Sequence, residues 1–239
     1  ATMEQYVDAL MRRMTLEEKI GQLNLPSAGH ITTGQAKSSD IAEKIRRGEV
    51  GGLFNIKGVE KIRDVQRIAV EESRLGIPLI FGMDVIHGYE TTFPIPLGLT
   101  ATWDMEAVER AARISAVEAS AAGICWTFSP MVDIARDPRW GRTPETYGED
   151  PFLSGKLGVA FVKGLQGNDP RYLKVVSTPK HFAANNEEHN RFECNPQISE
   201  RDLREYYLPA FERCIIDGKA QSIMTAYNAI NDVPCTLNT

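Results

Sequence analysis

Ile77-Pro78-Leu79-Ile80-Phe81-Gly82-Met83-Asp84 is the stretch that decides the fold: a short apolar run, then glycine, then an acidic residue. A run of this length between glycines is typical of a buried strand. It follows a segment in which apolar residues recur at helical spacing from Val59 to Ile68 and which closes at Gly76. A helix followed by a buried strand is the repeating unit of parallel α/β folds.

The same alternation extends outward in both directions. Helices are expected over 7–14, 15–23, 40–48, 59–76, 104–122 and 150–166, and from 199; strands are expected over 50–54, 77–81, 124–128, 173–177 and 221–224, with a sixth near 23–25. Thr15 with Glu18 reads as a capping box, and Asp150 before Pro151 as a cap with proline at the first helical position. We therefore expect an α/β fold, a TIM-like (β/α) barrel over 1–239 that is truncated before its last strands, since a full barrel has eight.

Composition narrows the class of partner. The formal net charge is −5 and the basic residues are dispersed, whereas nucleic-acid binders show a basic stripe, so no nucleic acid is expected. No uncharged apolar stretch is long enough for a membrane span. No zinc-like cysteine spacing, HExxH, P-loop or GxGxxG occurs, so we expect neither metal nor cofactor. Cys125 reads as a core residue, and a disulfide between Cys194 and Cys235 stays open.

Polar side chains follow several of the expected strands. Ligands of parallel α/β folds bind at the carboxyl ends of strands. Four such ends carry hydrogen-bonding groups: Asp84 after 77–81, Arg142 in the loop after Phe128, Lys180 and His181 after the strand through Ser177, and Tyr227 after 221–224. Together these groups donate and accept hydrogen bonds, which suits a neutral polyhydroxylated molecule.

Each of these residues also has a purely structural explanation. Asp84 alone is often a turn former or helix cap. Arg142 has Glu145 and Glu149 nearby as ion-pair partners, and Trp140 reads as core packing or as a platform for a sugar ring. Convergence on one rim is what favours function over these separate explanations.

Five motifs in order carry a family resemblance: Gly82-Met83-Asp84-Val85-Ile86-His87-Gly88, Arg136-Asp137-Pro138-Arg139-Trp140-Gly141-Arg142, Glu145-Thr146-Tyr147-Gly148-Glu149-Asp150-Pro151, Lys180-His181-Phe182 and Met224-Thr225-Ala226-Tyr227-Asn228. Together they resemble the N-terminal domain of family 3 glycoside hydrolases of the bacterial β-glucosidase type. The opening 15–23 is similar to that domain as well, so the resemblance covers essentially the whole chain.

The resemblance implies a retaining hydrolase that removes terminal non-reducing β-D-glucosyl residues in carbohydrate metabolism. It assigns substrate-binding roles to Asp84, Arg142, Lys180, His181, Arg191 and Tyr227, with Tyr227 orienting the nucleophile. The nucleophile of the family is an Asp in a later Ser-Asp-Trp-like motif, and the acid/base is a Glu from a following domain. We therefore expect no catalytic residue here, an inactive isolated chain, and C-terminal domains as its partners.

The sequence leaves the exact specificity and the cellular location open. Ala183-Ala184-Asn185-Asn186 stands where the N-acetylglucosaminidase branch has Pro-Gly-His, which favours the glucosidase branch. The alternatives are a β-xylosidase, an exo-glucanase, or a sugar-binding module without catalysis. Asp133 and Asp137 match the arginine-bearing loop and are not assigned catalysis. The resemblance favours a periplasmic or extracellular location, with a cytoplasmic one still open.

Overall fold

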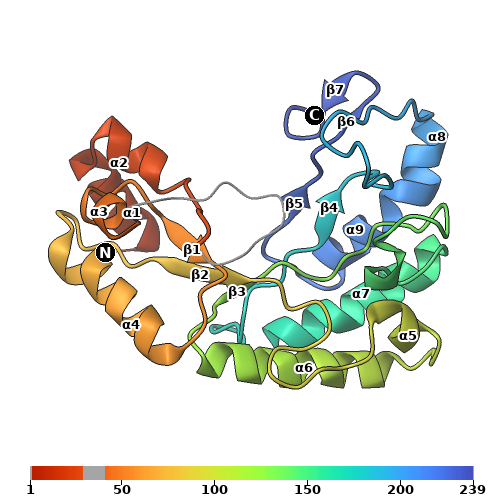
Figure 1. The fold of residues 1–239 in the computed structure, drawn as a ribbon, viewed down its shortest axis with the longest axis horizontal. Coiled ribbons are helices and arrows are strands. Elements are labelled where there is room, and N and C mark those ends of the chain that lie inside the picture. The colour runs from red at the N-terminus through yellow and green to blue at the C-terminus, as the bar shows by residue number, and fades with distance from the viewer. Residues whose placement is uncertain (1, 29–40, 239) are drawn as a thin grey trace. The chain divides into compact units, whose positions relative to one another are not determined.

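The computed structural model describes residues 2–28 and 41–238, and the chain divides into two compact units. Unit 1 comprises 1–83 with 121–125, and unit 2 comprises 84–120 with 126–239. Helices and short strands alternate through both, so the α/β prediction is confirmed (Figure 1).

Unit 1 is built around two parallel strands. Its elements are α1 (Met3–Arg13), α2 (Leu16–Gly21), α3 (Ile41–Arg46), β1 (Gly52–Phe54), α4 (Val59–Arg67), a π-helical turn (Ile68–Glu72) and β2 (Ile80–Met83). Leu53 of β1 lies opposite Phe81 of β2, and both side chains are buried. The expected cap of α3, Asp40, lies outside the described residues. The strand expected near 23–25 is wrong, because only Ser27 bridges to β1, at Phe54.

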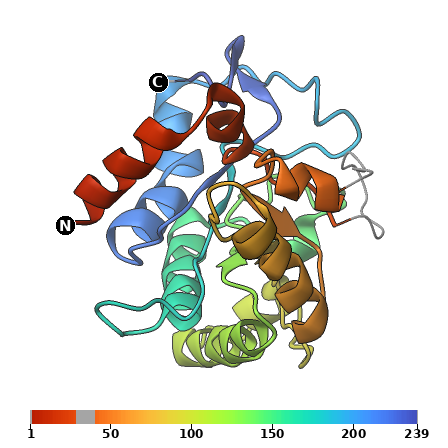
Figure 2. The ribbon, with the colours of Figure 1, turned by 90° about the vertical axis from the view of Figure 1, so that its left-hand side faces the viewer.

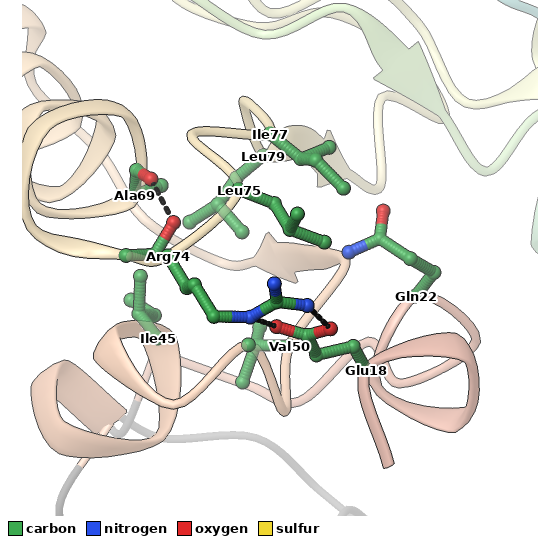
Figure 3. Close-up of a pocket in the computed structure, with 11 residues that line it drawn as sticks. Glu18, Gln22, Ile45, Val50, Ala69, Arg74, Leu75, Ile77 and Leu79 are labelled. Atoms are coloured by element: carbon green, nitrogen blue, oxygen red, sulfur yellow. Dashed lines mark hydrogen bonds and ion pairs between the residues drawn. The ribbon is translucent and has the colours of Figure 1, made fainter. Parts of the chain in front are cut away.

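The capping box predicted at Thr15 is present at the start of α2. The Thr15 hydroxyl accepts from the Glu18 backbone N–H, and the Glu18 carboxylate accepts from the Thr15 N–H at 2.9 Å. The same carboxylate binds Arg74 through both oxygens, with Arg74 Nε 2.9 Å from Oε1 (Figure 3). Apolar side chains including Ile45, Val50 and Leu79 surround the pair in a small cavity. Glu18 thus ties α2 to the segment after α4.

Replacing Glu18 with Gln isolates the ion pair, because Gln keeps the capping box. Hydrogen bonds from Arg74 and from the Thr15 backbone hold the pKa of Glu18 below its ordinary value of 4.5. A lowered folded-state pKa stabilises above the unfolded pKa, and that contribution disappears as pH falls through the folded pKa. We expect Glu18→Gln to be less stable than wild type at pH 7 in urea unfolding, and the difference to shrink below about pH 4. A difference that stays constant with pH would contradict this account of Arg74 and Glu18.

Unit 2 buries its core between three helices. Its elements are α5 (Pro96–Thr100), α6 (Met105–Ala121), β3 (Trp126–Thr127), a 3-10 turn (Thr143–Glu145), α7 (Pro151–Gln166), β4 (Lys180–Phe182), α8 (Glu200–Asp202), a π-helical turn (Leu203–Tyr207), α9 (Pro209–Ile216), β5 (Met224–Thr225), β6 (Ala229–Ile230) and β7 (Val233–Pro234). Helix α7 lies between α6 and α9 (Figures 1 and 2). Close approach requires glycine: a Cβ at Gly158 would lie 2.8 Å from Cys214 Sγ of α9, and one at Gly164 would meet the Glu109 carbonyl of α6.

The expected caps of unit 2 are confirmed. Asp150 accepts from the Leu153 N–H at the start of α7, and Ser199 accepts from the Asp202 N–H at the start of α8. Because both caps satisfy otherwise unpaired N–H groups, the helices begin where the sequence indicates.

The strand predicted over 173–177 is wrong. Only Val176 bridges to a neighbour, Trp126 of β3, and the paired strand is β4 itself, which runs parallel to β5. Lys180 and His181 therefore belong to a strand instead of following one. Between the bridge and β4, the Thr178 N–H donates to the Ser129 carbonyl and the Lys180 N–H to that of Pro130.

Two further differences from the sequence predictions concern the hairpin near the end of unit 2 and the burial of a cysteine. Strands β6 and β7 form an antiparallel hairpin that the alternation does not anticipate, with Asn231 and Asp232 both at positive φ in its turn. Cys125 is exposed, so its assignment to the core is wrong. Its Sγ lies 3.3 Å from the Phe81 backbone N, at the surface of unit 1. Cys194 and Cys235 are both free thiols.

Candidate functional site

A buried lysine anchors the site in unit 2. Lys180 of β4 has 3% of its side chain exposed, and its ammonium group pairs with the carboxylate of Asp84. A buried cation requires such a partner because its desolvation is otherwise unfavourable. Asp84 directly follows β2 in the chain and has 55% of its side chain exposed. The pair thus presents an accessible carboxylate backed by a buried positive charge.

His181, the next residue along β4, is held in place by hydrogen bonds to Asp133. One carboxylate oxygen of Asp133, Oδ2, lies 2.9 Å from the His181 backbone nitrogen and 3.0 Å from its Nδ1. Asp133 comes from the loop after β3 and is buried within an apolar run. Lys180 and His181 thus each have a carboxylate partner, Asp84 and Asp133.

Arg142 extends the network toward the 3-10 turn. Its Nε and Nη2 donate to the two oxygens of Glu145 at 2.8 and 2.9 Å, and its Nη1 lies 3.4 Å from His181 Nε2. Burial would raise the pKa of Glu145, but the hydrogen bonds from Arg142 and the charges of Arg142 and Lys180 hold that pKa below its ordinary value. Burial likewise opposes the charge of Arg142, while Glu145 raises the pKa of the guanidinium overall.

Arg191 is held by a carboxylate and two aromatic rings. Its Nη1 donates to Glu188 at 2.6 Å, and its guanidinium lies 5.1 Å from the ring centroid of Phe192 and 5.4 Å from that of Tyr227. These distances are in the range of cation–π contacts. Glu188, Phe192 and Tyr227 therefore surround the Arg191 guanidinium.

The six residues singled out from the sequence lie in unit 2 and make three contacts: Asp84 with Lys180, Arg142 with His181, and Arg191 with Tyr227. Lys180 and His181 are consecutive in β4, which joins the first two contacts into one network, whereas Arg191 and Tyr227 form a second group with Glu188. Asp84 and Lys180 are 96 positions apart in the sequence, so local structure does not account for their contact. The ion pair of Arg142 with Glu145 is present as well, so its structural explanation holds alongside its place in the network.

An open hollow adjoins this network. It is lined by two loops, with Asp137, Arg139, Trp140, Gly141, Asn186, Glu187, Glu188 and His189. Trp140 is 6% exposed, so packing describes it better than a stacking platform does. Its indole N–H has no hydrogen-bond partner among the described residues.

Sequence reasoning did not anticipate several network partners: Asp133, Asn185 and Glu188. The first had a readable signal, because a lone carboxylate inside the apolar run 131–134 must bind something once buried. The other two lie in a polar loop, where no pattern separates a network residue from a solvated one.

Two further groups of features concern the described residues alone. Within 2–28 and 41–238, no group of three or more His, Cys, Asp and Glu side chains is placed to hold a metal ion. None of the helices in these ranges is long and apolar enough to cross a membrane.

Comparison with known proteins places the chain. The model of the glycosyl hydrolase family 3 N-terminal domain matches residues 15–239. The chain belongs to this family. Its fold is accordingly TIM-like, an α/β domain that is incomplete in this chain.

The similar proteins include β-glucosidases and β-xylosidases. The chain is 40% identical over 236 residues to a periplasmic β-glucosidase of Salmonella typhimurium, covering 98% of the chain and 30% of that protein. It is also 40% identical over 202 residues to an exo-1,4-β-xylosidase of Emericella nidulans, covering 73% of the chain and 26% of that protein. The structure of a β-glucosidase from Listeria innocua in complex with isofagomine matches with a TM-score of 0.88 at 38% identity, covering 100% of the chain and 34% of that structure. The chain thus spans about a third or less of the length of these relatives.

Proposed function

We propose that this chain forms the sugar-binding part of a retaining β-glucosidase, which hydrolyses terminal non-reducing β-D-glucosyl residues. One observation supports the proposal: consecutive residues of β4 link an accessible carboxylate, Asp84, through the buried Lys180 to the imidazole of His181 and the half-buried guanidinium of Arg142. Sugar hydroxyls both donate and accept hydrogen bonds, and charged partners make the stronger bonds.

Each of the six residues has a part in this proposal. Asp84 accepts hydrogen bonds from hydroxyls of the terminal sugar. Arg142, Lys180, His181 and Arg191 bind its other hydroxyls, and Tyr227 orients the nucleophile, which later residues of the protein supply. The ion pairs of Lys180, Arg142 and Arg191 hold these side chains in place, so little ordering is needed when a sugar binds.

The test is hydrolysis of an aryl β-glucoside by the complete protein, with the product followed by proton NMR. A retaining mechanism releases β-glucose first, and the α anomer appears only later by mutarotation. First release of α-glucose would rule out the retaining assignment. Binding of glucose without any hydrolysis would support a sugar-binding module instead.

A β-xylosidase is the second candidate, favoured by the xylosidases among the similar proteins. Xylosides lack the hydroxymethyl group of glucosides, so the ratio of kcat/KM for matched aryl glycosides separates the two. We expect the glucoside to be preferred by about 10-fold or more, the scale of one hydrogen-bonding group in a fitted pocket. Preference for the xyloside would shift the assignment, and preference for longer β-glucans would favour an exo-glucanase.

We infer further that residues 1–239 act as one N-terminal domain that needs the C-terminal domains of the same protein, and that the protein is periplasmic or extracellular. The periplasmic name of one relative supports the location, which cell fractionation tests directly. If the two units form one domain, Glu18→Gln in unit 1 lowers the melting temperature of the whole chain. Near-UV circular dichroism and activity then report a single unfolding transition at the same temperature. Two separate transitions would make them independent domains.

A further inference from the structure

His181 rests on a carboxylate to which the proposed function gives no role. Asp133 Oδ2 accepts from the His181 backbone N–H at 2.9 Å and lies 3.0 Å from Nδ1. The two side chains are almost fully buried, with 1% of Asp133 and 10% of His181 exposed. Asp133 follows β3 and His181 lies in β4, so the contact joins two neighbouring segments of unit 2.

The groups on both sides of the ring require the same tautomer. A carboxylate oxygen only accepts hydrogen bonds, so the Nδ1 that faces Asp133 carries a proton. A guanidinium only donates, so the Nε2 that faces Arg142 Nη1 at 3.4 Å presents its lone pair. The ring with Nδ1–H and a free Nε2 lone pair is the neutral imidazole.

The remaining neighbours of the ring do not change this assignment. The uncharged Asn185 amide lies 3.4 Å from Nδ1, farther than Asp133. Lys180 precedes His181 in β4, and Glu145 acts on the imidazole only through its charge. Glu145 occupies Nε and Nη2 of Arg142, so Nη1 is the guanidinium nitrogen left for His181.

We propose that Asp133 is a positioning residue that holds the proton of His181 on Nδ1, so that the Nε2 lone pair accepts a hydrogen bond from a sugar hydroxyl. The inference rests on the function proposed above. Lys180 and Arg142 only donate, so an accepting His181 beside them sets the direction in which a shared hydroxyl must point. At 3.4 Å the bond from Arg142 is long, which leaves Nε2 free to exchange it for a hydroxyl.

Nitrogen-15 NMR of the complete protein with labelled histidine reads the tautomer directly. A His181→Gln variant identifies the His181 signals by their loss. We expect Nδ1 to be protonated and Nε2 to be unprotonated at neutral pH, in wild type and in Asp133→Asn. A proton on Nε2 in wild type would overturn the proposal. The spectrum reports the tautomer whether or not the protein hydrolyses a substrate. Failure of this proposal can therefore be distinguished from failure of the proposed function.

Kinetics of two matched variants tests the consequence. Asp133→Asn keeps a carbonyl oxygen that can accept from both His181 N–H groups, whereas Asp133→Leu has a similar size and no acceptor. Loss of the group that orients a functional histidine typically costs about 10- to 100-fold, so we expect kcat/KM to fall by that factor in the Leu variant and by only a few-fold in the Asn variant. Equal losses in both, with unchanged melting temperatures, would overturn the role of hydrogen-bond acceptance. If the Leu variant does not fold, the Asn variant and the spectrum still decide.

Discussion

The isolated 239-residue chain should hydrolyse aryl β-glucosides at least roughly 10⁴-fold more slowly than the complete protein, because substrate-binding groups alone give little rate acceleration. Retaining glycosidases need two carboxyl groups beside the scissile bond, one as nucleophile and one as acid/base. The sequence contains no Ser-Asp-Trp, the motif in which the family carries its nucleophile.

The carboxylates of the network are already committed to other partners. Asp84 pairs with Lys180, Glu145 binds Nε and Nη2 of Arg142 through its two oxygens, and Glu188 binds Arg191. The pKa of Glu145 is lowered, whereas a glycosidase acid needs a raised pKa. These groups are therefore suited to positioning and not to proton transfer or attack.

The comparison requires that the isolated chain be folded. Circular dichroism and binding of glucose by calorimetry establish this independently of turnover. A folded chain that turns over substrate near the rate of the complete protein would show that the nucleophile and the acid/base lie within these residues.

Asp84→Ala in the complete protein should lower kcat/KM by at least about 100-fold, a loss of roughly 2.7 kcal/mol. Hydrogen bonds that sugar hydroxyls donate to carboxylates strengthen in the transition state. The substitution also leaves the buried Lys180 ammonium without its partner. Steady-state kinetics on an aryl β-glucoside measures the loss.

Two further variants make this result specific. Asp84→Asn keeps one accepting oxygen and should fall between wild type and the Ala variant. Asp169→Ala removes a loop aspartate of unit 2 that binds only the backbone N–H groups of Arg171 and Tyr172, and it should leave kcat/KM unchanged. Full activity in Asp84→Ala would return that residue to the role of a turn former.

Sequence patterns predicted the helices best, because their signals are local. The caps at Thr15, Asp150 and Ser199 each satisfy N–H groups within the same turn, and each helix begins there. The strands were less well predicted because pairing depends on distant segments. The run 173–177 was predicted as a strand, yet Val176 is the residue of this run that forms a β-bridge, and the paired strand starts at Lys180.

The residues of the candidate site were also predicted unevenly from the sequence. Strand ends and motifs indicated the six candidate residues, since both can be read along the chain. Their partners are not paired by any local pattern: Asp133 lies 48 positions from His181 in the sequence, and Glu188 lies in a polar loop beside Arg191. Those partners nevertheless decide the protonation and direction of the groups that would meet a ligand.

A crystal structure of the complete protein with bound glucose tests the central claim most directly. The account predicts one glucose whose hydroxyls lie within hydrogen-bond distance of Asp84, Lys180 and His181, with Arg142 and Arg191 completing the ring of contacts and His181 offering Nε2. A glucose bound elsewhere, with the ion pair of Asp84 and Lys180 intact and no hydroxyl near either residue, would contradict it.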